Sequence, residues 1–325
     1  MNNQKYNSII CEKLGSINTL KVVENKREML QKNQVRIKVK ACGINFPDKL
    51  MVEGKYQLKP PLPFTPGMEV SGIITETNSK KFCNGNKVIA HMRYGGYSEE
   101  IIVNQENVKI MPNVFSFEEA AGFIVAAQTA YVSLVERANI KSGNTLLVLG
   151  ATGGVGLAAI QLAVTIGAKV IAICSNKKKQ NAAIQAGAQY AFNYNEMINK
   201  VKEATNNEGV DIIYDPIGGK YFSQSLKVIK WGGKVLVIGF ASGMIPSLAM
   251  NYALIKGISI LGVRAGEYFR RFPHKKGPAL KKLFDIANSG NINPYIHEAI
   301  PLSKCISALK KVENREVIGR LVLKP

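Results

Sequence analysis

The sequence predicts an α/β protein in which a doubly wound parallel sheet is inserted into a β-rich domain. From about residue 126, apolar runs of strand length alternate with stretches of helical length, and the strands lie around residues 146–149, 170–173, 190–192, 212–214, 235–238 and 258–263. This alternation is typical of a parallel sheet with helices on both faces. The first 125 residues instead form short β-like segments between turn clusters, and residues 35–41 alternate apolar and polar side chains.

The glycine-rich segment after residues 145–149 indicates a dinucleotide-binding turn. The apolar run ends at Gly150, and Gly153, Gly154 and Gly156 follow before an apolar, helix-like stretch. Glycines at such a turn let the backbone approach a pyrophosphate, which the free N–H groups of the helix N-terminus bind. Three glycines alone often mark only a tight turn. Here a predicted strand precedes them and a predicted helix follows, which favours the nucleotide site.

The residues after the second predicted strand, 168–174, favour NADPH over NADH. An NAD-specific site usually places Asp or Glu at this strand end to accept a hydrogen bond from the ribose 2′-OH. This chain has Ser175, Asn176 and three lysines at 177–179. A carboxylate would repel a 2′-phosphate, whereas a hydroxyl and ammonium groups bind it. The alternative is that the lysines form the solvated first turn of a surface helix.

Length and composition predict a two-domain cytoplasmic protein. The 325 residues exceed what one small core needs. No apolar run approaches the ~20 residues that span a bilayer, and the polar start lacks the apolar segment of a secretory signal. The five cysteines are scattered without a Cys-x-x-Cys pair, which favours free thiols over a disulfide framework.

The net charge of +20 raises nucleic-acid binding as a minor hypothesis. However, the lysines are spread along the whole chain, and there is no arginine-rich arm, zinc-finger spacing or aromatic RNA-binding signature. The same charge favours an anionic cofactor.

Motifs along essentially the whole chain resemble the medium-chain dehydrogenase/reductase superfamily, and specifically its zinc-independent NADPH:quinone reductase branch. They include Cys42-Gly-Ile-Asn-Phe-Pro-Asp48, Phe64-Thr-Pro-Gly-Met-Glu-Val-Ser-Gly72, Ala127-Gln-Thr-Ala-Tyr-Val-Ser-Leu134, the glycine turn at 150–156, Tyr214-Asp-Pro-Ile-Gly-Gly219 and the segment 231–240. The resemblance implies a GroES-like substrate domain formed by residues 1–125 plus 264–325. It also implies a Rossmann NADPH-binding domain at 126–263, and a homodimer paired through the strand at 258–263.

The resemblance also implies that no catalytic metal is present. The zinc branch carries a cysteine in the first motif and Gly-His-Glu in the second, where this chain has Asn45 and Met68. Amide and thioether groups are poor Zn²⁺ ligands compared with thiolate and imidazole. Without a Lewis acid, we expect a substrate that accepts hydride readily, such as a quinone or an α,β-unsaturated carbonyl.

Two residues are the catalytic candidates. Tyr56 stands at the spacing where related enoyl-thioester reductases carry an active-site tyrosine, and its phenol could bind a carbonyl oxygen or donate a proton. Packing on the proline-rich loop at 58–67 is an equal alternative. Asn45 resembles a family residue that contacts the nicotinamide ribose or the substrate, and capping of the turn at Pro47 is its alternative role.

The resemblance carries over a set of cofactor-binding residues, each a neighbour of the nicotinamide, the pyrophosphate or the 2′-phosphate. The nicotinamide side is assigned to Asn45, Thr129, Gly239 and Phe240, the pyrophosphate to Gly153, Gly154 and Val155, and the 2′-phosphate to Ser175, Lys179 and Tyr194. The charged segment at 264–271 could line the substrate cleft, but its charges favour a solvated surface.

The leading hypothesis is therefore an NADPH-dependent quinone reductase. An enone or enoyl-thioester reductase, including one for small acyl-CoA substrates, is the alternative among enzymes. An NADPH-binding sensor or RNA-binding, crystallin-like protein is the alternative of another class, because a fold does not fix its function.

Overall fold

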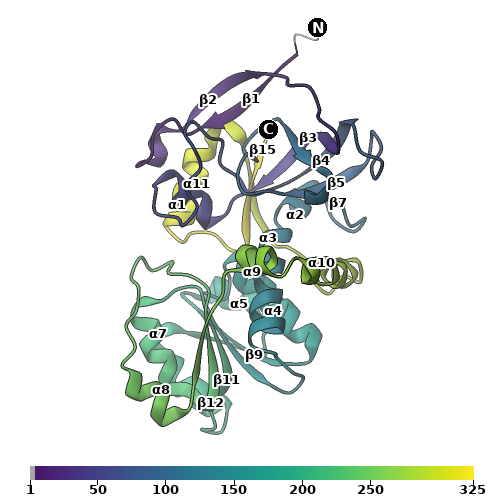
Figure 1. Ribbon diagram of the computed structural model, residues 1–325. Helices are drawn as coiled ribbons and strands as arrows, with labels where there is room; N and C mark the ends of the chain where they lie inside the picture. Colours follow the sequence, from purple (N-terminus) through teal and green to yellow (C-terminus); the bar gives the residue numbers. More distant parts are fainter. Residues whose placement is uncertain (1–3) are drawn as a thin grey trace. The chain divides into compact units, whose positions relative to one another are not determined.

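The computed structural model describes residues 4–325, and the chain divides into two compact units (Figure 1). One unit comprises Met1–Val125 and Pro294–Pro325, and the other comprises Ala126–Asn293. The first residues of the polar start, 1–3, lie outside the described residues. Within residues 4–325, none of the helices combines the length and the apolar character needed to cross a membrane.

The second boundary lies at 293/294, whereas the sequence analysis placed it at residue 264. The helices α9 (Ala265–Arg271) and α10 (Pro273–Asn288) belong to the second unit. Their side chains form hydrogen bonds within the second unit: Tyr268 Oη and Lys275 Nζ each donate to Glu136 Oε2 at 2.7 Å. Periodicity along the chain does not reveal these long-range bonds, which hold both helices to the second unit.

The second unit contains the predicted doubly wound sheet. Its six strands are all parallel, in the order β10-β9-β8-β11-β12-β13. Their bounds in this order are Tyr190–Asn193, Lys169–Cys174, Thr145–Leu149, Val210–Asp215, Ile229–Val237 and Ser259–Gly262. The central strand β8 is apolar over residues 146–149, which are fully buried, as expected of a strand covered on both faces.

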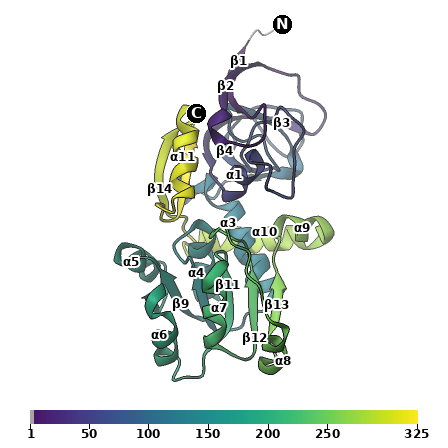
Figure 2. The same cartoon turned by 90° about the vertical axis from the view of Figure 1, so that its left-hand side faces the viewer.

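Helices in the connections cover this sheet. They are α4 (Gly154–Ile166), α5 (Lys177–Gln185), α6 (Met197–Ala204), α7 (Gly219–Ser225) and α8 (Met250–Lys256). Figure 2 shows the strands side by side, with β13 at one edge and α8 beside it. A further helix, α3 (Ile124–Tyr131), is followed by a π-helical turn at Val132–Arg137.

The first unit is β-rich, and its main sheet has seven strands in the order β14-β15-β3-β4-β5-β7, with β6 also paired to β3. In chain order these are β3 (Gln34–Gly43), β4 (Glu69–Thr77), β5 (Lys87–His91), β6 (Glu100–Asn104), β7 (Val108–Ile110), β14 (Ile296–Pro301) and β15 (Arg320–Lys324). A separate hairpin pairs β1 (Lys5–Ile10) with β2 (Lys21–Lys26).

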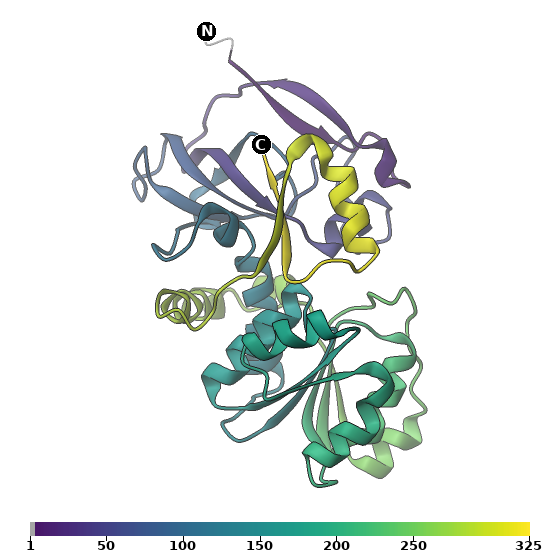
Figure 3. The same ribbon diagram turned by 180° about the vertical axis from the view of Figure 1, so that it is seen from behind.

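The C-terminal segment completes this unit. Strand β15 pairs antiparallel with β3, so the C-terminal segment joins a sheet formed by strands from the first part of the chain, and Figure 3 shows the yellow C-terminal elements beside the purple N-terminal ones. The helices here are α1 (Phe46–Val52), α2 (Phe117–Ala121) and α11 (Cys305–Glu313). Ser116 caps α2 and forms a capping box with Glu119.

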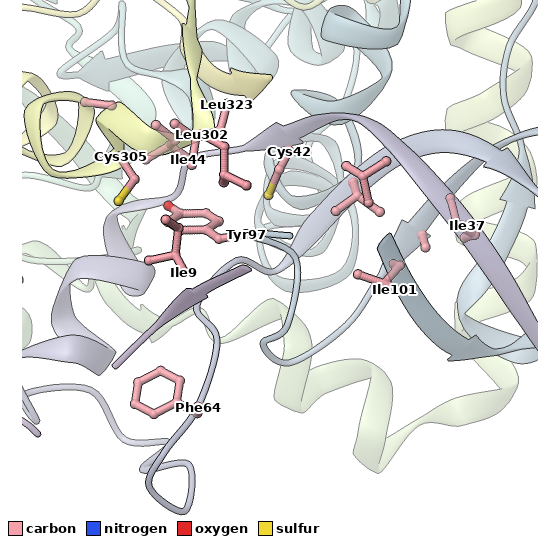
Figure 4. Packing of buried hydrophobic residues seen from close by; sticks show 14 of the residues in the cluster. Ile9, Ile37, Cys42, Ile44, Phe64, Tyr97, Ile101, Leu302, Cys305 and Leu323 are labelled. Atoms are coloured by element: carbon pink, nitrogen blue, oxygen red, sulfur yellow. The ribbon is translucent and has the colours of Figure 1, made fainter. Parts of the chain in front are cut away.

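The core of the first unit surrounds Tyr97, which is fully buried. Figure 4 shows its ring between Cys42 and Cys305, above Ile9. A buried phenol needs a hydrogen-bond partner, and Tyr97 Oη donates to Asp48 Oδ2 at 3.0 Å. This bond brings a polar cluster into an otherwise apolar core.

Candidate functional site

The carboxyl edge of the parallel sheet gathers most of the predicted cofactor residues. Strand β8 pairs with β9 on one side and β11 on the other, so the strand order reverses there, and ligands of open α/β sheets bind at such a point. The loops and first helical turns that leave β8, β9, β10 and β12 carry Gly153, Gly154, Val155, Ser175, Lys179, Tyr194, Gly239 and Phe240.

The turn between β8 and α4 presents backbone to this edge. Gly150 has φ +58°, and a Cβ there would lie 2.5 Å from Ile217 Cδ1, so only glycine fits. Helix α4 begins at Gly154 with Gly153 as its N-cap, and no side chain caps it within the described residues. The N–H groups of its first turn therefore remain available to a pyrophosphate.

Ser175 and Tyr194 follow adjacent strand ends, because Cys174 pairs with Asn193 in the sheet register. Ser175 is exposed, and Asn176 caps α5 by accepting from the Lys179 N–H at 2.9 Å. This cap places Lys179 in the first turn of α5, where its side chain is half-buried. A hydroxyl and an ammonium group thus stand at the end of β9.

The phenol of Tyr194 lies on the glycine turn. Its oxygen accepts from the Gly150 N–H at 2.8 Å, and its ring contacts Tyr221 at a centroid distance of 4.0 Å. Burial raises the pKa of Tyr194 well above its ordinary value, so the hydroxyl keeps its proton. That proton is the donor the side chain can offer to a phosphate.

The loops after β11 and β12 are bonded to each other beside this edge. The N–H of Ala241 donates to Pro216 O at 3.0 Å, and Phe240 packs against Gly218. Asp215 shapes the first loop, since its Oδ1 accepts from the N–H groups of Ile217 and Gly218 at 2.7 and 2.8 Å. These bonds set the positions of Gly239 and Phe240.

Thr129 lies in α3 and is half-buried. Its carbonyl oxygen accepts from Ser133 Oγ at 2.6 Å, in the π-helical turn that follows. Single π-helical turns are frequent at functional sites, because they shift the side chains of a helix relative to one another.

In the first unit, Asn45 belongs to a buried polar cluster. It is the N-cap of α1 and is 3% exposed. Its Nδ2 donates to Glu69 Oε1 at 2.9 Å, and its Oδ1 accepts from Arg320 Nη1 at 2.9 Å. Arg320 also forms an ion pair with Glu69 through Nη2. The Asn45 side chain therefore joins α1, β4 and β15.

Two carboxyl groups in this cluster are fully buried, which costs free energy unless they are protonated or paired. Asp48 Oδ2 accepts from Asn45 N at 2.8 Å and from Tyr97 Oη, while Asp48 Oδ1 has no hydrogen-bond partner among residues 4–325. Burial raises the pKa of Asp48 to about 7, although both donors oppose this. Burial also raises the pKa of Glu69, and Arg320 opposes that shift.

Tyr56 and Asn45 lie at opposite ends of α1. Asn45 caps the N-terminus of the helix, and Tyr56 follows its C-terminus, where the Tyr56 N–H donates to Leu50 O at 3.1 Å. The Tyr56 side chain is partly buried and packs on the core of the first unit, as does Met68.

Sequence reasoning missed three members of the cluster. Asp48 and Glu69 lie inside the motifs quoted above, next to residues that were singled out, and their acidic side chains in apolar surroundings were the signal. No local signal marks Arg320, which is 275 residues from Asn45 in the chain. Within residues 4–325, no group of three or more His, Cys, Asp or Glu side chains is arranged to hold a metal ion.

Comparisons with known proteins cover nearly the whole chain. Residues 31–143 match the alcohol dehydrogenase GroES-like domain family, and residues 154–279 match the zinc-binding dehydrogenase family. A quinone oxidoreductase-like protein 2 homolog of Nematostella vectensis is 36% identical over 98% of this chain and 89% of its own length.

Two solved structures share the fold over nearly their full length. The quinone oxidoreductase of Escherichia coli, complexed with NADPH, has a TM-score of 0.88 and 29% identity and covers 98% of this chain and 100% of its own. The CurK enoyl reductase also has a TM-score of 0.88, with 25% identity and 99% coverage of each chain.

Proposed function

This chain belongs to the zinc-independent quinone oxidoreductase branch of the medium-chain dehydrogenase/reductase superfamily, and we propose that it reduces a quinone with NADPH. Its relatives support an oxidoreductase that binds a nicotinamide cofactor. The choice of NADPH and of a quinone is the proposal. One observation carries the choice of cofactor: the end of β9 presents Ser175 and Lys179 at the sheet edge that holds the glycine turn, with no carboxylate in the segment 175–179.

The residues at the carboxyl edge fit this cofactor. The first-turn N–H groups of α4 bind the pyrophosphate, and the hydroxyl of Ser175, the ammonium of Lys179 and the phenol proton of Tyr194 bind the 2′-phosphate. Gly239 and Phe240, which follow β12, are the residues we assign next to the nicotinamide. When bound, NADPH supplies the hydride. The protein holds it in one orientation at the edge of the sheet.

A quinone suits the groups that the first unit offers. Its conjugated carbonyls spread the incoming charge onto oxygen, so neutral hydrogen-bond donors are sufficient to orient it. Asn45 Nδ2 has a second N–H beyond the one that binds Glu69. We assign the substrate or nicotinamide contact to this N–H, and proton donation to Tyr56.

An enone or enoyl-thioester substrate is the second candidate, favoured by the likeness to an enoyl reductase. The same donors would bind an enone carbonyl oxygen. Rates of NADPH and NADH oxidation with 1,4-benzoquinone, methyl vinyl ketone and crotonyl-CoA as separate acceptors test both candidates. Turnover of the quinone alone supports the first, and turnover of the enones alone supports the second. NADPH binding without turnover of any acceptor favours the sensor or RNA-binding alternative.

We also propose a homodimer in the cytoplasm, joined at β13. This strand lies at the edge of the parallel sheet, and Ile260 on it is 38% exposed. Apolar side chains nearby are more exposed, with Trp231 at 81% and Leu254 at 82%. Exposed apolar edge strands are rare in monomers, because their unpaired backbone groups can pair with a strand of another molecule. A second copy paired along β13 covers this surface.

A further inference from the structure

The guanidinium of Arg320 contacts both polar partners of the cluster at once. Nη1 donates to Asn45 Oδ1 at 2.9 Å, and Nη2 forms the ion pair with Glu69 Oε1. The three side chains are 7%, 3% and 0% exposed for Arg320, Asn45 and Glu69, so water screens these contacts little. Because Asn45 Nδ2 donates to the same Glu69 oxygen, the three groups form a closed ring of hydrogen bonds.

This ring determines which way the Asn45 amide points. A guanidinium only donates hydrogen bonds, and a carboxylate only accepts them. The amide oxygen must therefore face Arg320, and the amide nitrogen must face Glu69. A flipped amide would set an N–H against the guanidinium and a carbonyl against the carboxylate. The remaining Nδ2 hydrogen is then the donor this side chain can offer to a ligand.

The backbone of β3 leaves the space that these three side chains need to meet. A Cβ at Gly43, on β3, would lie 2.8 Å from Glu69 Oε1 and closer still to Ala121 O, so only glycine lets Glu69 reach the ring. Glu69 Oε2 accepts from Val125 N at 2.9 Å, in the first turn of α3, the helix that carries Thr129. The two oxygens of the Glu69 carboxylate thus bind different segments of the chain, Oε1 in the ring and Oε2 at the start of α3.

Charge in the cluster depends on Arg320. The buried titratable groups that face one another here are Asp48, Glu69, Cys42 and Tyr97. Each of these four groups is either neutral or, when ionised, negatively charged. Burial raises the pKa of Asp48, Glu69 and Cys42, and the positive charge of Arg320 opposes this rise. It offsets the cost of an ionised Glu69 in the core.

We propose that Arg320 is a positioning residue that fixes Asn45 as a hydrogen-bond donor toward a carbonyl or hydroxyl oxygen of the bound ligand. The inference rests on the reductase function proposed above. It assigns the ligand an acceptor atom at this point, and it gives Arg320 a role through Asn45 without any contact of its own with the ligand.

The test compares Arg320→Met, Arg320→Lys and the double variant Glu69→Gln/Arg320→Met. Arg320→Met leaves Glu69 buried without its counter-ion, so we expect a lower unfolding temperature and a kcat/KM reduced about tenfold or more. The double variant removes both charges and should recover most of the unfolding temperature. Its kcat/KM should stay low, because the Asn45 oxygen has lost its donor. Arg320→Lys should restore part of the activity.

A second measurement separates this inference from the quinone proposal. In protein labelled with nitrogen isotope at asparagine, the Asn45 side-chain amide, assigned by its loss in Asn45→Ser, should exchange hydrogen slowly in the wild type and faster in both Met variants. If the wild type turns over no quinone, the amide exchange still tests Arg320. A double variant with wild-type kcat/KM, or with unchanged amide exchange, would show that the ion pair only stabilises the fold.

Discussion

The hydroxyl oxygen of Tyr194 accepts a hydrogen bond from the backbone N–H of Gly150 at 2.8 Å. This bond joins the end of β10 to the glycine turn after β8, across the intervening strand β9. One side chain thus holds the backbone that we propose faces the pyrophosphate, and its own proton is free to be donated to the cofactor.

Tyr194→Phe should therefore weaken both stability and NADPH binding. The part-buried Gly150 N–H loses its partner, which costs about 1 kcal/mol of the free energy of unfolding. We expect the KM for NADPH to rise severalfold, while kcat at saturating NADPH changes little. Steady-state kinetics and thermal unfolding measure the two effects. Tyr190→Phe, on the strand β10 that precedes Tyr194 and 37% exposed, is the control, and equal effects from both substitutions would contradict the assignment.

Lys179→Ala tests the 2′-phosphate site. A positive charge within a few ångströms of a phosphate favours its binding, and NADH has no such phosphate. We expect a KM for NADPH raised about tenfold and nearly unchanged use of NADH. Lys177→Ala, an exposed lysine in the same helical turn, is the control. An equal loss with both cofactors would remove Lys179 from the site.

Asp48 should make stability depend on pH. Burial raises its pKa from the ordinary 3.8 to about 7, so the folded state holds the proton more tightly than the unfolded chain does. The contribution of the protonated group is complete below about pH 4 and is lost as pH rises through about 7.

The measurement is the unfolding temperature of the wild type minus that of Asp48→Asn, from pH 4 to pH 8. We expect this difference to fall as pH rises, by the equivalent of a few kcal/mol at most. Asp285→Asn, in an exposed pair with Lys281, is the control. A flat difference across this range would mean that Asp48 is ionised throughout.

Ile260→Lys should separate the proposed dimer. A lysine in the middle of an exposed edge strand opposes pairing with an identical strand, because two like charges would meet there. Light scattering after size exclusion should report a dimer for the wild type and a monomer for the variant. Met29→Lys, which is 92% exposed outside this surface, should leave the mass unchanged. A monomeric wild type would rule the interface out.

Tyr56→Phe examines the proposed proton donor. Removing the hydroxyl should lower kcat by about tenfold or more if the phenol donates a proton in the reaction, since general acids contribute at least that much. Unaltered kcat would leave Tyr56 with its packing role on the core of the first unit.

Local features of this chain could be predicted well. The glycine turn and the parallel strands around it depend on residues a few positions apart, so their periodicity and turn chemistry are visible in the sequence. The positions of Ser175 and Lys179 at the end of β9 follow from the same local rules.

Tertiary structure alone decided the contacts that join distant segments. The sequence marks Asn45 as a candidate, but the pairing of β15 with β3 is what brings Arg320 to it from 275 residues away. Likewise, the bonds of Tyr268 and Lys275 to Glu136 decided that residues 264–293 belong to the nucleotide unit. Periodicity identifies each strand and helix separately. Which of them lie side by side depends on how the whole core packs, and that determines which buried charges find a partner.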